Sequence, residues 1–346
     1  MNIYYHEKQA LHDPQTYFSR GKMREPQEVP QRVYEFQKGI KNAGLTVTKP
    51  QELGLDYLTQ VHGLAYIDFL RTAYNEWHKV PEDWGDEVIP NIFVKDYNAQ
   101  KGILAKAARY IADGSAPIGK YTWESIYWSA QSALNAAKDL CEGKKYSLSI
   151  SRPSGHHARR EAAGGFCFVN NAAIATEYLL ENSRAKKILI LDTDVHHGQG
   201  IQEIFYERAD VLYISLHGDP TNFYPVVAGF EEERGVGKGE GFNINYPFAH
   251  GLSEEAYLTL LDEAIESAQT FNPDVIIHNM GFDVYKDDPQ SKTAVTTLGI
   301  YKIAQAVLAL NKPVLGLIEG GYLIEKLAVN MESYLRGFKE VLADEN

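Results

Sequence analysis

Short apolar runs alternate with longer amphipathic segments along most of the chain. The apolar runs are typical of buried strands, and the longer segments carry apolar residues at helical spacing. Strands are expected at 146–151, 187–192, 211–217, 274–278 and 313–318, and helices at 169–183, 201–207, 253–271, 298–310 and 324–342. Ser253 suits the N-cap of its helix, with Glu254 and Glu255 in the first turn. This alternation predicts an α/β domain with a mostly parallel sheet and helices on both faces.

The segment 79–121 breaks this pattern. It contains Pro81, Pro90 and Pro117, several glycines and little periodicity at its start. We therefore expect an insertion or a long surface loop within a single domain that spans residues 1–346. Long loops in compact domains are usually functional or mobile.

Composition narrows the classes of partner. The chain of 346 residues has 46 acidic and 34 basic residues and a net charge of −12, which argues against nucleic acid as a partner. Since the sequence shows no apolar run of membrane-spanning length and no signal-peptide pattern, we expect no membrane partner and a cytoplasmic location. The two cysteines, Cys141 and Cys167, cannot form a disulfide framework or a Cys-rich zinc cluster. The acidic balance either keeps the protein soluble or steers cationic substrates towards it.

The densest polar cluster, at 192–198, directly follows a predicted strand. Alternate residues of a strand share a face, so Asp192, Asp194 and His196 point the same way if the extended conformation continues past the strand. A carboxylate and an imidazole on one face form half of a metal site. The alternative is a solvated turn, which also uses Asp, His and Gly. Two carboxylates crowded at a sheet end favour the interpretation as a cation site.

Adjacent histidines, His156 and His157, follow the predicted strand 146–151. They are open to three interpretations: metal ligands, an acid/base pair, or a chance polar turn. Gly165 and Phe166 lie a few residues further on, in a loop whose glycines let the backbone approach a ligand closely.

Two more predicted strands end in candidate residues. Asp283 follows the strand 274–278; alone it is a turn residue, but with Asp194 and His196 it completes a three-ligand catalytic zinc site with an open position. Tyr322 follows the strand 313–318 on a Gly-Gly hinge and either reaches into the site or forms an aromatic lid. Because ligands of parallel sheets bind beyond the carboxyl ends of the strands, these clusters predict one site.

Taken together and in this order, the motifs resemble those of the arginase–deacetylase superfamily, and within it the family of histone deacetylases and acetylpolyamine amidohydrolases. The matching stretches are RPSGHHA, GGFCFVNNAAIA, ILDTDVHHGQG, SLHGDP, GFDVYKDDP and EGGY. The resemblance spans nearly the whole chain. It implies a single open α/β domain around a central eight-stranded sheet, zinc-dependent removal of acetyl groups from amines, and a homodimer.

The resemblance also implies a role for each matching residue. The expected metal ligands are Asp194, His196 and Asp283, and the expected catalytic residues are His156, His157 and Tyr322. Asp192 and Gln199 are expected behind the two histidines, and a structural K⁺ is expected at Asp192, Asp194, His196, Ser215 and Leu216. Substrate is expected to contact Phe166, Tyr224, Gly165 and Arg32.

Three features set this chain apart within the family it resembles. Gln199 stands where histone deacetylases usually have an acid, so the pKa of His157 is expected to be lower. The segment 79–121 resembles the insertion by which the polyamine enzymes dimerise and narrow the mouths of their active sites. The acid that meets the distal amine of a polyamine is not clearly matched; a loose alignment places Ser115 there, with Asp113 nearby.

The sequence therefore predicts a zinc-dependent amidohydrolase that removes acetyl or short acyl groups from small amines such as acetylpolyamines. The closest alternative is a protein acetyl-lysine deacetylase. An inactive acyl-lysine reader would have no use for His156, His157 and Tyr322, and an arginase-like enzyme would need carboxylates around a second metal ion. Zinc and ferrous iron both suit two carboxylates and one imidazole.

Overall fold

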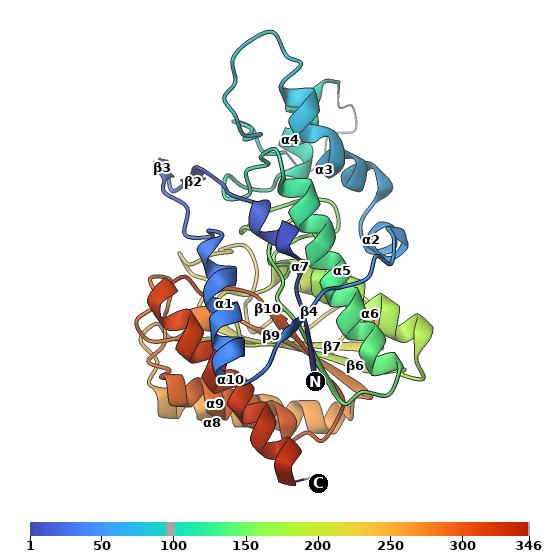
Figure 1. Ribbon diagram of the computed structural model, residues 1–346, viewed down its shortest axis with the longest axis vertical. Helices are drawn as coiled ribbons and strands as arrows, with labels where there is room; N and C mark the ends of the chain where they lie inside the picture. The colour runs from blue at the N-terminus through green and yellow to red at the C-terminus, as the bar shows by residue number, and fades with distance from the viewer. Residues whose placement is uncertain (95–100, 345–346) are drawn as a thin grey trace.

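A parallel sheet forms the centre of the computed structural model, which describes residues 1–94 and 101–344 (Figure 1). Within these residues eight strands make one sheet in the order β4-β1-β5-β10-β9-β6-β7-β8, with every neighbouring pair parallel. The strands are β1 (Asn2–Tyr4), β4 (Val47–Thr48), β5 (Tyr146–Ser149), β6 (Ile188–Asp192), β7 (Val211–Gly218), β8 (Asn243–Phe248), β9 (Val275–Met280) and β10 (Val314–Ile318). A separate antiparallel hairpin pairs β2 (Tyr17–Ser19) with β3 (Lys22–Arg24).

Helices cover both faces of the sheet, and Figure 1 shows α8 to α10 grouped at the lower left and α5 and α6 at the right. The helices are α1 (Gln31–Asn42), α2 (Asp56–Val61), α3 (Leu64–Trp77), α4 (Ile103–Tyr110), α5 (Thr122–Cys141), α6 (Asn171–Asn182), α7 (Gln199–Phe205), α8 (Glu254–Phe271), α9 (Thr297–Leu308) and α10 (Ile324–Asp344). Short 3₁₀ turns occur at Glu7–Leu11, Gly237–Gly239 and Phe282–Val284. Within the described residues, no helix is long and apolar enough to cross a membrane.

Alternate residues of the central strands contribute side chains to two hydrophobic cores, one on each face of the sheet. In β6, Ile188 and Ile190 pack on the side of α5 and α6, whereas Leu189 and Leu191 pack on the side of α8 to α10. All four are fully buried. A strand buried on both faces reads as a continuous apolar run, which is why the sequence pattern finds it.

The predicted α/β class and the predicted elements are confirmed, with bounds that differ by a few residues. Ser253 caps α8, since its side chain accepts a hydrogen bond from the backbone N–H of Ala256 at 3.2 Å. The pattern does not predict the two edge strands, β4 and β8, or the strand β1 beside β4. The strands β1 and β4 have only three and two residues.

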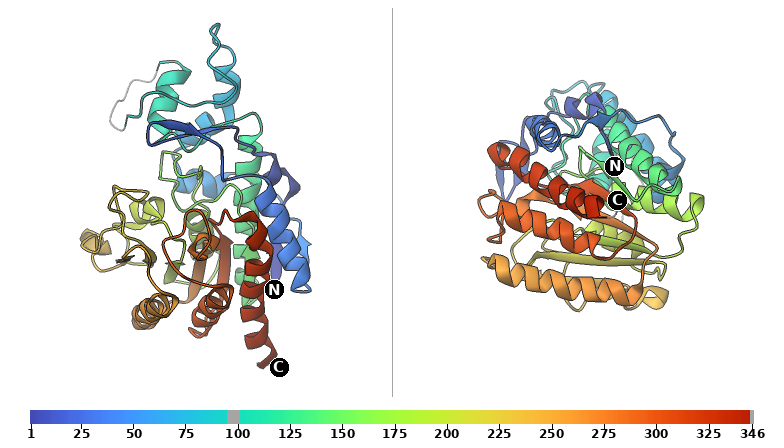
Figure 2. Two further views of the ribbon diagram at one scale, coloured as in Figure 1. Left: turned by 90° about the vertical axis from the view of Figure 1, so that its left-hand side faces the viewer. Right: turned by 60° about the horizontal axis from the view of Figure 1, so that its bottom comes forward.

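The segment 79–121 is more ordered than the sequence indicates. It contains α4, so the expectation of a loop is wrong for Ile103–Tyr110, and Val88 pairs with Ile118 in an antiparallel bridge. Figure 2 shows α4 and its surroundings projecting beyond the layered body. Residues 95–100, which also belong to the predicted insertion, lie outside the described residues.

Candidate active site

Four neighbouring strands of the sheet deliver the candidate residues to one edge. Because β5, β10, β9 and β6 are parallel and adjacent, the loops after them start side by side. These loops carry His156 and His157, then Tyr322, then Asp283, and finally Asp194 and His196. The predicted convergence of the four polar clusters is therefore what the topology produces.

Asp194, His196 and Asp283 form a compact buried group. One ligand atom from each lies within 4.8 Å of the other two. Nδ1 of His196 is 3.2 Å from Oδ1 of Asp194 and 3.2 Å from Oδ2 of Asp283. Backbone N–H groups fix both carboxylates: Val195 donates to Asp283 at 3.1 Å and Gly320 donates to Asp194 at 2.8 Å.

The charges of this group fit a divalent cation. Burial and the negative charge of Asp194 raise the pKa of Asp283 to about 7. Burial opposes the charged form of His196, but hydrogen bonds to Asp194 and Asp283 outweigh it and raise its pKa to about 9. A Cβ on Gly281 or Gly320 would collide with these carboxylates, so both glycines keep the space beside them open. Two carboxylates and an imidazole held this way form a donor set for zinc or ferrous iron.

Asp192 does not share the orientation of Asp194 and His196. The strand β6 ends at Asp192 and the chain then bends, so the extended conformation on which the expected common face depends does not continue. Instead, Oδ2 of Asp192 lies 3.0 Å from Nδ1 of His156, and its Oδ1 accepts a hydrogen bond from the backbone N–H of Asp194. Asp192 thus lies behind His156, where the resemblance places it.

The tandem histidines have different partners. The rings of His156 and His157 lie 3.9 Å apart between centroids. Burial lowers the pKa of His156, but the charges of Asp194 and Asp192 outweigh it and raise that pKa to about 10. Nδ1 of His157 lies 2.7 Å from Oε1 of the neutral Gln199. Burial and the neighbouring His156 hold the pKa of His157 well below its usual range, and the hydrogen bond to Gln199 opposes this shift. A pKa lower than with an acidic partner in place of Gln199 stays a prediction.

Tyr322 is held by its backbone and by a buried arginine. Asp288 accepts hydrogen bonds from the backbone N–H groups of Tyr322 and Leu323, at 2.6 and 2.9 Å. The guanidinium of Arg32 lies 5.0 Å from the centre of the Tyr322 ring and donates to the carbonyls of Gly321 and Glu319. Burial raises the pKa of Tyr322 well above its usual range, so its hydroxyl stays a hydrogen-bond donor.

A cavity of about 310 Å³ leads to this group from the surface. Phe166 and Tyr224 form part of its wall, together with His157, His196, Phe223 and Tyr322. Gly165 and Phe166 both have positive φ values, 56° and 66°. A Cβ on Gly165 would collide with the His157 ring, so glycine is required at this position.

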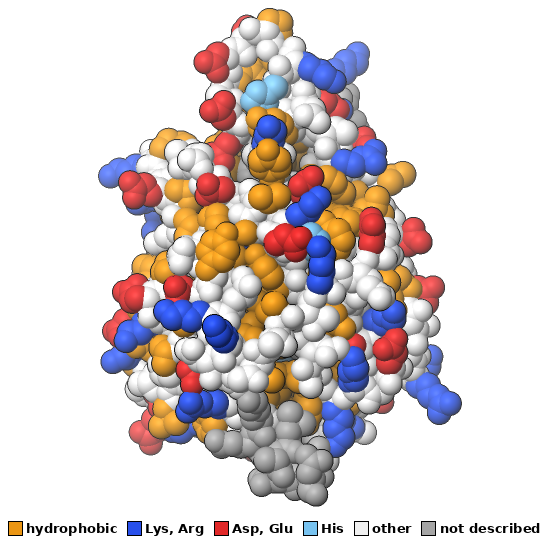
Figure 3. Space-filling view, in the orientation of Figure 1, with side chains coloured by type: hydrophobic (Ala, Val, Ile, Leu, Met, Phe, Trp, Pro, Cys, Tyr) orange, Lys and Arg blue, Asp and Glu red, His pale blue; other side chains and the backbone are white. Residues whose placement is uncertain are grey.

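The mouth of this cavity is basic. Arg20, Arg24 and Lys292 line it, and its lining includes no carboxylate. Within the described part of the chain, none of the three makes an ion pair. Ser115 lines the cavity. Asp113 does not line it, and its carboxylate accepts a hydrogen bond from the Tyr224 hydroxyl. Acidic and basic side chains are interspersed on the face that Figure 3 shows, so the net charge of −12 is no guide to the charge at the mouth.

The residues expected around K⁺ lie on, or directly after, the neighbouring strands β6 and β7. Asp192 pairs in register with Ser215 of β7, and Leu216 follows it. All three are fully buried. Oδ1 of Asp192 also accepts a hydrogen bond from the backbone N–H of Asp194 at 3.1 Å. A monovalent cation at these residues stays a prediction.

Glu319 is a site residue that sequence reasoning does not assign. One of its carboxylate oxygens accepts hydrogen bonds from the backbone N–H groups of Gly155 and His156, at 2.8 and 3.2 Å, and the other accepts from Asn279. Glu319 therefore fixes the loop that carries the tandem histidines. The signal was its place in the EGGY stretch, directly after β10.

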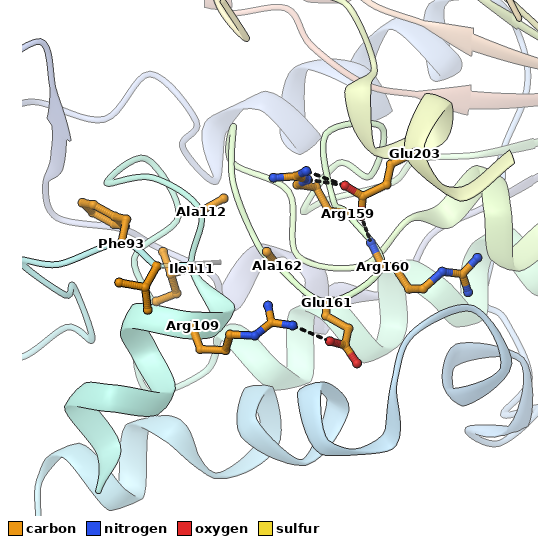
Figure 4. A pocket seen from close by; sticks show the side chains of 10 residues that line it. Phe93, Arg109, Ile111, Ala112, Arg159, Arg160, Glu161, Ala162 and Glu203 are labelled. Carbon is orange, nitrogen blue, oxygen red and sulfur yellow. Dashed lines mark hydrogen bonds and ion pairs between the residues drawn. The ribbon is translucent and has the colours of Figure 1, made fainter. Parts of the chain in front are cut away.

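A second cavity of about 330 Å³ lies where the segment containing α4 meets the loop after His157 (Figure 4). Ion pairs join Arg109 to Glu161 at 2.7 Å and Arg159 to Glu203 at 2.5 Å. Ile111 also pairs with Ala163 in a parallel bridge. The Arg109–Glu161 ion pair and the Ile111–Ala163 bridge dock the segment onto the loop between His157 and Phe166. The Arg159–Glu203 ion pair joins that loop to α7.

Comparison with known proteins agrees with this architecture. The family model of the histone deacetylase domain matches residues 26–338, so the chain belongs to this family and is a hydrolytic deacetylase. The acetylpolyamine amidohydrolase of Burkholderia pseudomallei is 52% identical, over 98% of each chain. Acetylpolyamine amidohydrolase 1 of Pseudomonas aeruginosa is 36% identical, over 97% of this chain and 98% of its own.

Solved structures give the same result. A crystal structure of the acetylpolyamine aminohydrolase from Burkholderia pseudomallei superposes with a TM-score of 0.96, at 51% identity and 98% coverage of both chains. The HD domain of HDA15 superposes with a TM-score of 0.80, at 27% identity, and covers 97% of this chain and 88% of its own. The predicted fold and family are confirmed.

Proposed function

We propose that the enzyme removes acetyl groups from small acetylated amines, with acetylpolyamines as the leading class. The observation that carries the proposal is a buried group of Asp194, His196 and Asp283 that faces two imidazoles and a phenol at the base of a narrow cavity. The names of the two bacterial relatives support the substrate class.

Asp194, His196 and Asp283 would hold one zinc ion, for which ferrous iron is an alternative, and K⁺ would lie near Asp192, Ser215 and Leu216. The divalent ion would supply a water molecule of lowered pKa and polarise the acyl carbonyl. An arginase-like enzyme would need two catalytic ions per chain. A measured content of one divalent ion per chain would therefore support the deacetylase.

Side chains of the protein transfer the protons and stabilise the charge that develops. His157 takes a proton from the attacking water through its free Nε2 and later passes a proton to the nitrogen of the leaving amine, so that acetate and a free amine form. His156, oriented by Asp192 at 3.0 Å, stabilises the negative charge that develops. Tyr322 donates a hydrogen bond to the developing oxyanion.

The aromatic wall fits the alkyl chain of an acetylated amine. Tyr17 and Phe166 meet edge to face with ring centres 5.4 Å apart, and Phe166 and Tyr322 at 5.9 Å. Tyr224 lies across the cavity beside His157. The rings exclude water from the acetamide group and align the methylene chain of the substrate along the cavity. The further role of 79–121 in narrowing the mouth, a homodimer and a cytoplasmic location stay predictions.

A substrate comparison tests the proposal. The zinc-loaded enzyme is incubated with N-acetylputrescine and with an acetyl-lysine peptide, and released acetate is measured. We expect kcat/KM to be at least about tenfold higher for N-acetylputrescine. A higher value for the peptide would contradict the substrate class and favour a protein deacetylase. Absence of acetate release from both would contradict the deacetylase assignment for these amines.

A further inference from the structure

A chain of hydrogen bonds leads from His157 to a carboxylate outside the metal-ligand group. Nδ1 of His157 lies 2.7 Å from Oε1 of Gln199, and Nε2 of Gln199 lies 3.3 Å from the hydroxyl oxygen of Tyr224. The Tyr224 hydroxyl donates to Oδ2 of Asp113 at 2.7 Å. Two side chains, joined by three hydrogen bonds, therefore connect His157 with Asp113, which itself comes from the segment 79–121.

The carboxylate fixes the direction of every hydrogen bond in this chain. A carboxylate accepts and a tyrosine hydroxyl has a single proton, so Tyr224 must donate to Asp113. The Tyr224 oxygen can then only accept from Gln199, which directs the amide nitrogen towards Tyr224 and the amide oxygen towards His157. An amide oxygen accepts, so His157 carries its proton on Nδ1 and leaves Nε2 free.

The position of Asp113 is also fixed. Its Oδ1 accepts from the backbone N–H of Ser115 at 2.8 Å and from the Ser115 hydroxyl, which in turn accepts from the backbone N–H of Gly165 at 2.9 Å. Both oxygens of Asp113 are thus engaged within the protein. Figure 4 shows the neighbouring Arg109, Ile111 and Ala112 beside the loop that contains Ala162. The Arg109–Glu161 ion pair also holds the segment 79–121 against this loop.

We propose that Asp113 is a positioning residue which, through Tyr224 and Gln199, holds His157 in the tautomer that leaves Nε2 free to accept a proton. The inference rests on the proposed role of His157 as the base. In this arrangement Gln199 accepts the hydrogen bond from His157, as a carboxylate at this position would. An amide has a donor end and an acceptor end, so it accepts here only because Tyr224 fixes which end faces the imidazole.

The isosteric substitution Asp113→Asn separates this role from packing. The backbone N–H of Ser115 still requires an acceptor at the Oδ1 position, so the new amide nitrogen faces Tyr224. Tyr224 must then accept from it and donate to Gln199, and the Gln199 amide turns over and donates to Nδ1 of His157. The proton of His157 moves to Nε2, which can no longer act as a base.

A second substitution supplies the rescue. Gln199→Glu places an acceptor beside His157 whatever Tyr224 does. For Asp113→Asn alone we expect kcat to fall roughly 10- to 100-fold with KM changed less than about twofold, since general base catalysis typically contributes this much or more. In the Gln199→Glu background the same substitution is expected to lower kcat less than about threefold.

Glu161→Gln is the matched control, because it removes a carboxylate that ties the same segment to the same loop. We expect its kcat to stay within about twofold of the unsubstituted enzyme. A loss as large as that of Asp113→Asn would show that the segment acts only by docking, and would contradict the inference.

The tautomer itself is measured by ¹⁵N NMR of histidine-labelled, zinc-loaded protein, with His157→Ala used to assign the signals. The protonated nitrogen of His157 is expected to be Nδ1 in the unsubstituted protein and Nε2 in Asp113→Asn. An unchanged tautomer, or an equal loss of kcat in both Gln199 backgrounds, would overturn the inference. Because this readout needs no turnover, it decides the inference even if the proposed substrate class fails.

Discussion

The two ends of the active-site cavity differ in charge, burial and origin. At its base, Asp194 and Asp283 are fully buried and come from loops that directly follow strands of the sheet. At its mouth, Arg20 and Arg24 are exposed and come from the β2–β3 hairpin, and Lys292 is half-buried in the loop after β9. One cavity therefore runs from a buried base with two carboxylates to an exposed mouth with basic side chains.

The difference teaches which substitutions should matter most. Charges at the base interact at low effective dielectric and have partners fixed by the backbone, so each contact is strong. Charges at the mouth are screened by water and salt within about 8–10 Å. Substitutions at the base should therefore abolish a step of the reaction, whereas substitutions at the mouth should change only the preference among substrates.

The largest expected effect is at the base, from Tyr322→Phe. The substitution removes one hydroxyl and keeps the ring, so bound zinc should be unchanged while kcat falls roughly 10²- to 10³-fold, the usual loss of one oxyanion donor. Zinc content by atomic absorption and kcat on N-acetylputrescine are the measurements. Tyr206→Phe, outside the cavity lining, serves as the control. Near-normal turnover by Tyr322→Phe would show that the oxyanion role is misassigned.

The second effect is the pH dependence of zinc binding. The pKa of His196 in the metal-free protein is raised to about 9, so at pH 7 a zinc ion must displace its proton. Zinc affinity should therefore rise about tenfold per pH unit between pH 7 and pH 9. Below pH 7 the slope should steepen, because Asp283, with a pKa raised to about 7, must also lose a proton.

Zinc-buffered titrations at several pH values measure this dependence. His250→Gln is a suitable control, because His250 is exposed and contacts the backbone carbonyl of Asp219 rather than a ligand. An affinity that does not change between pH 7 and pH 9 would contradict the charge state assigned to the base of the cavity.

The same contrast explains how much the sequence could predict. The base was predictable because Asp194, Asp283 and Tyr322 follow buried strands, and parallel pairing of those strands fixes where their ends meet. The role of Asp192 was harder to derive from local spacing, since the chain bends after β6 and turns the side chain towards His156.

The mouth and the link to Asp113 were not predictable in this way. Arg20 and Lys292 lie far apart in the sequence and meet only through the packing of a hairpin against a loop, which no strand register fixes. Asp113 reaches Tyr224 because α4 and the bridge between Ile111 and Ala163 dock its segment, and the pattern of 79–121 predicts neither. Tertiary packing of irregular segments leaves no periodic signal in the sequence.

The smallest expected effect is at the mouth. Arg20 and Lys292 repel the free ammonium of N-acetylputrescine, so the double substitution Arg20→Gln with Lys292→Gln should lower KM roughly two- to fivefold at low salt, through a weak Coulomb interaction in water. The change should disappear near 1 M salt, where the Debye length is about 3 Å. N-acetylspermidine, with two ammonium groups, should gain more than N-acetylputrescine.

An uncharged substrate separates repulsion from a change in shape. KM for N-butylacetamide, which has no ammonium group, should be the same in both enzymes. Lys286→Gln is the matched control, because Lys286 lies on the same loop, pairs with Asp287 at 3.9 Å and does not line the cavity. A salt-independent change in KM, or an equal change for N-butylacetamide, would mean that the mouth selects substrates by shape, and the contrast in charge between the two ends would then have no role in specificity.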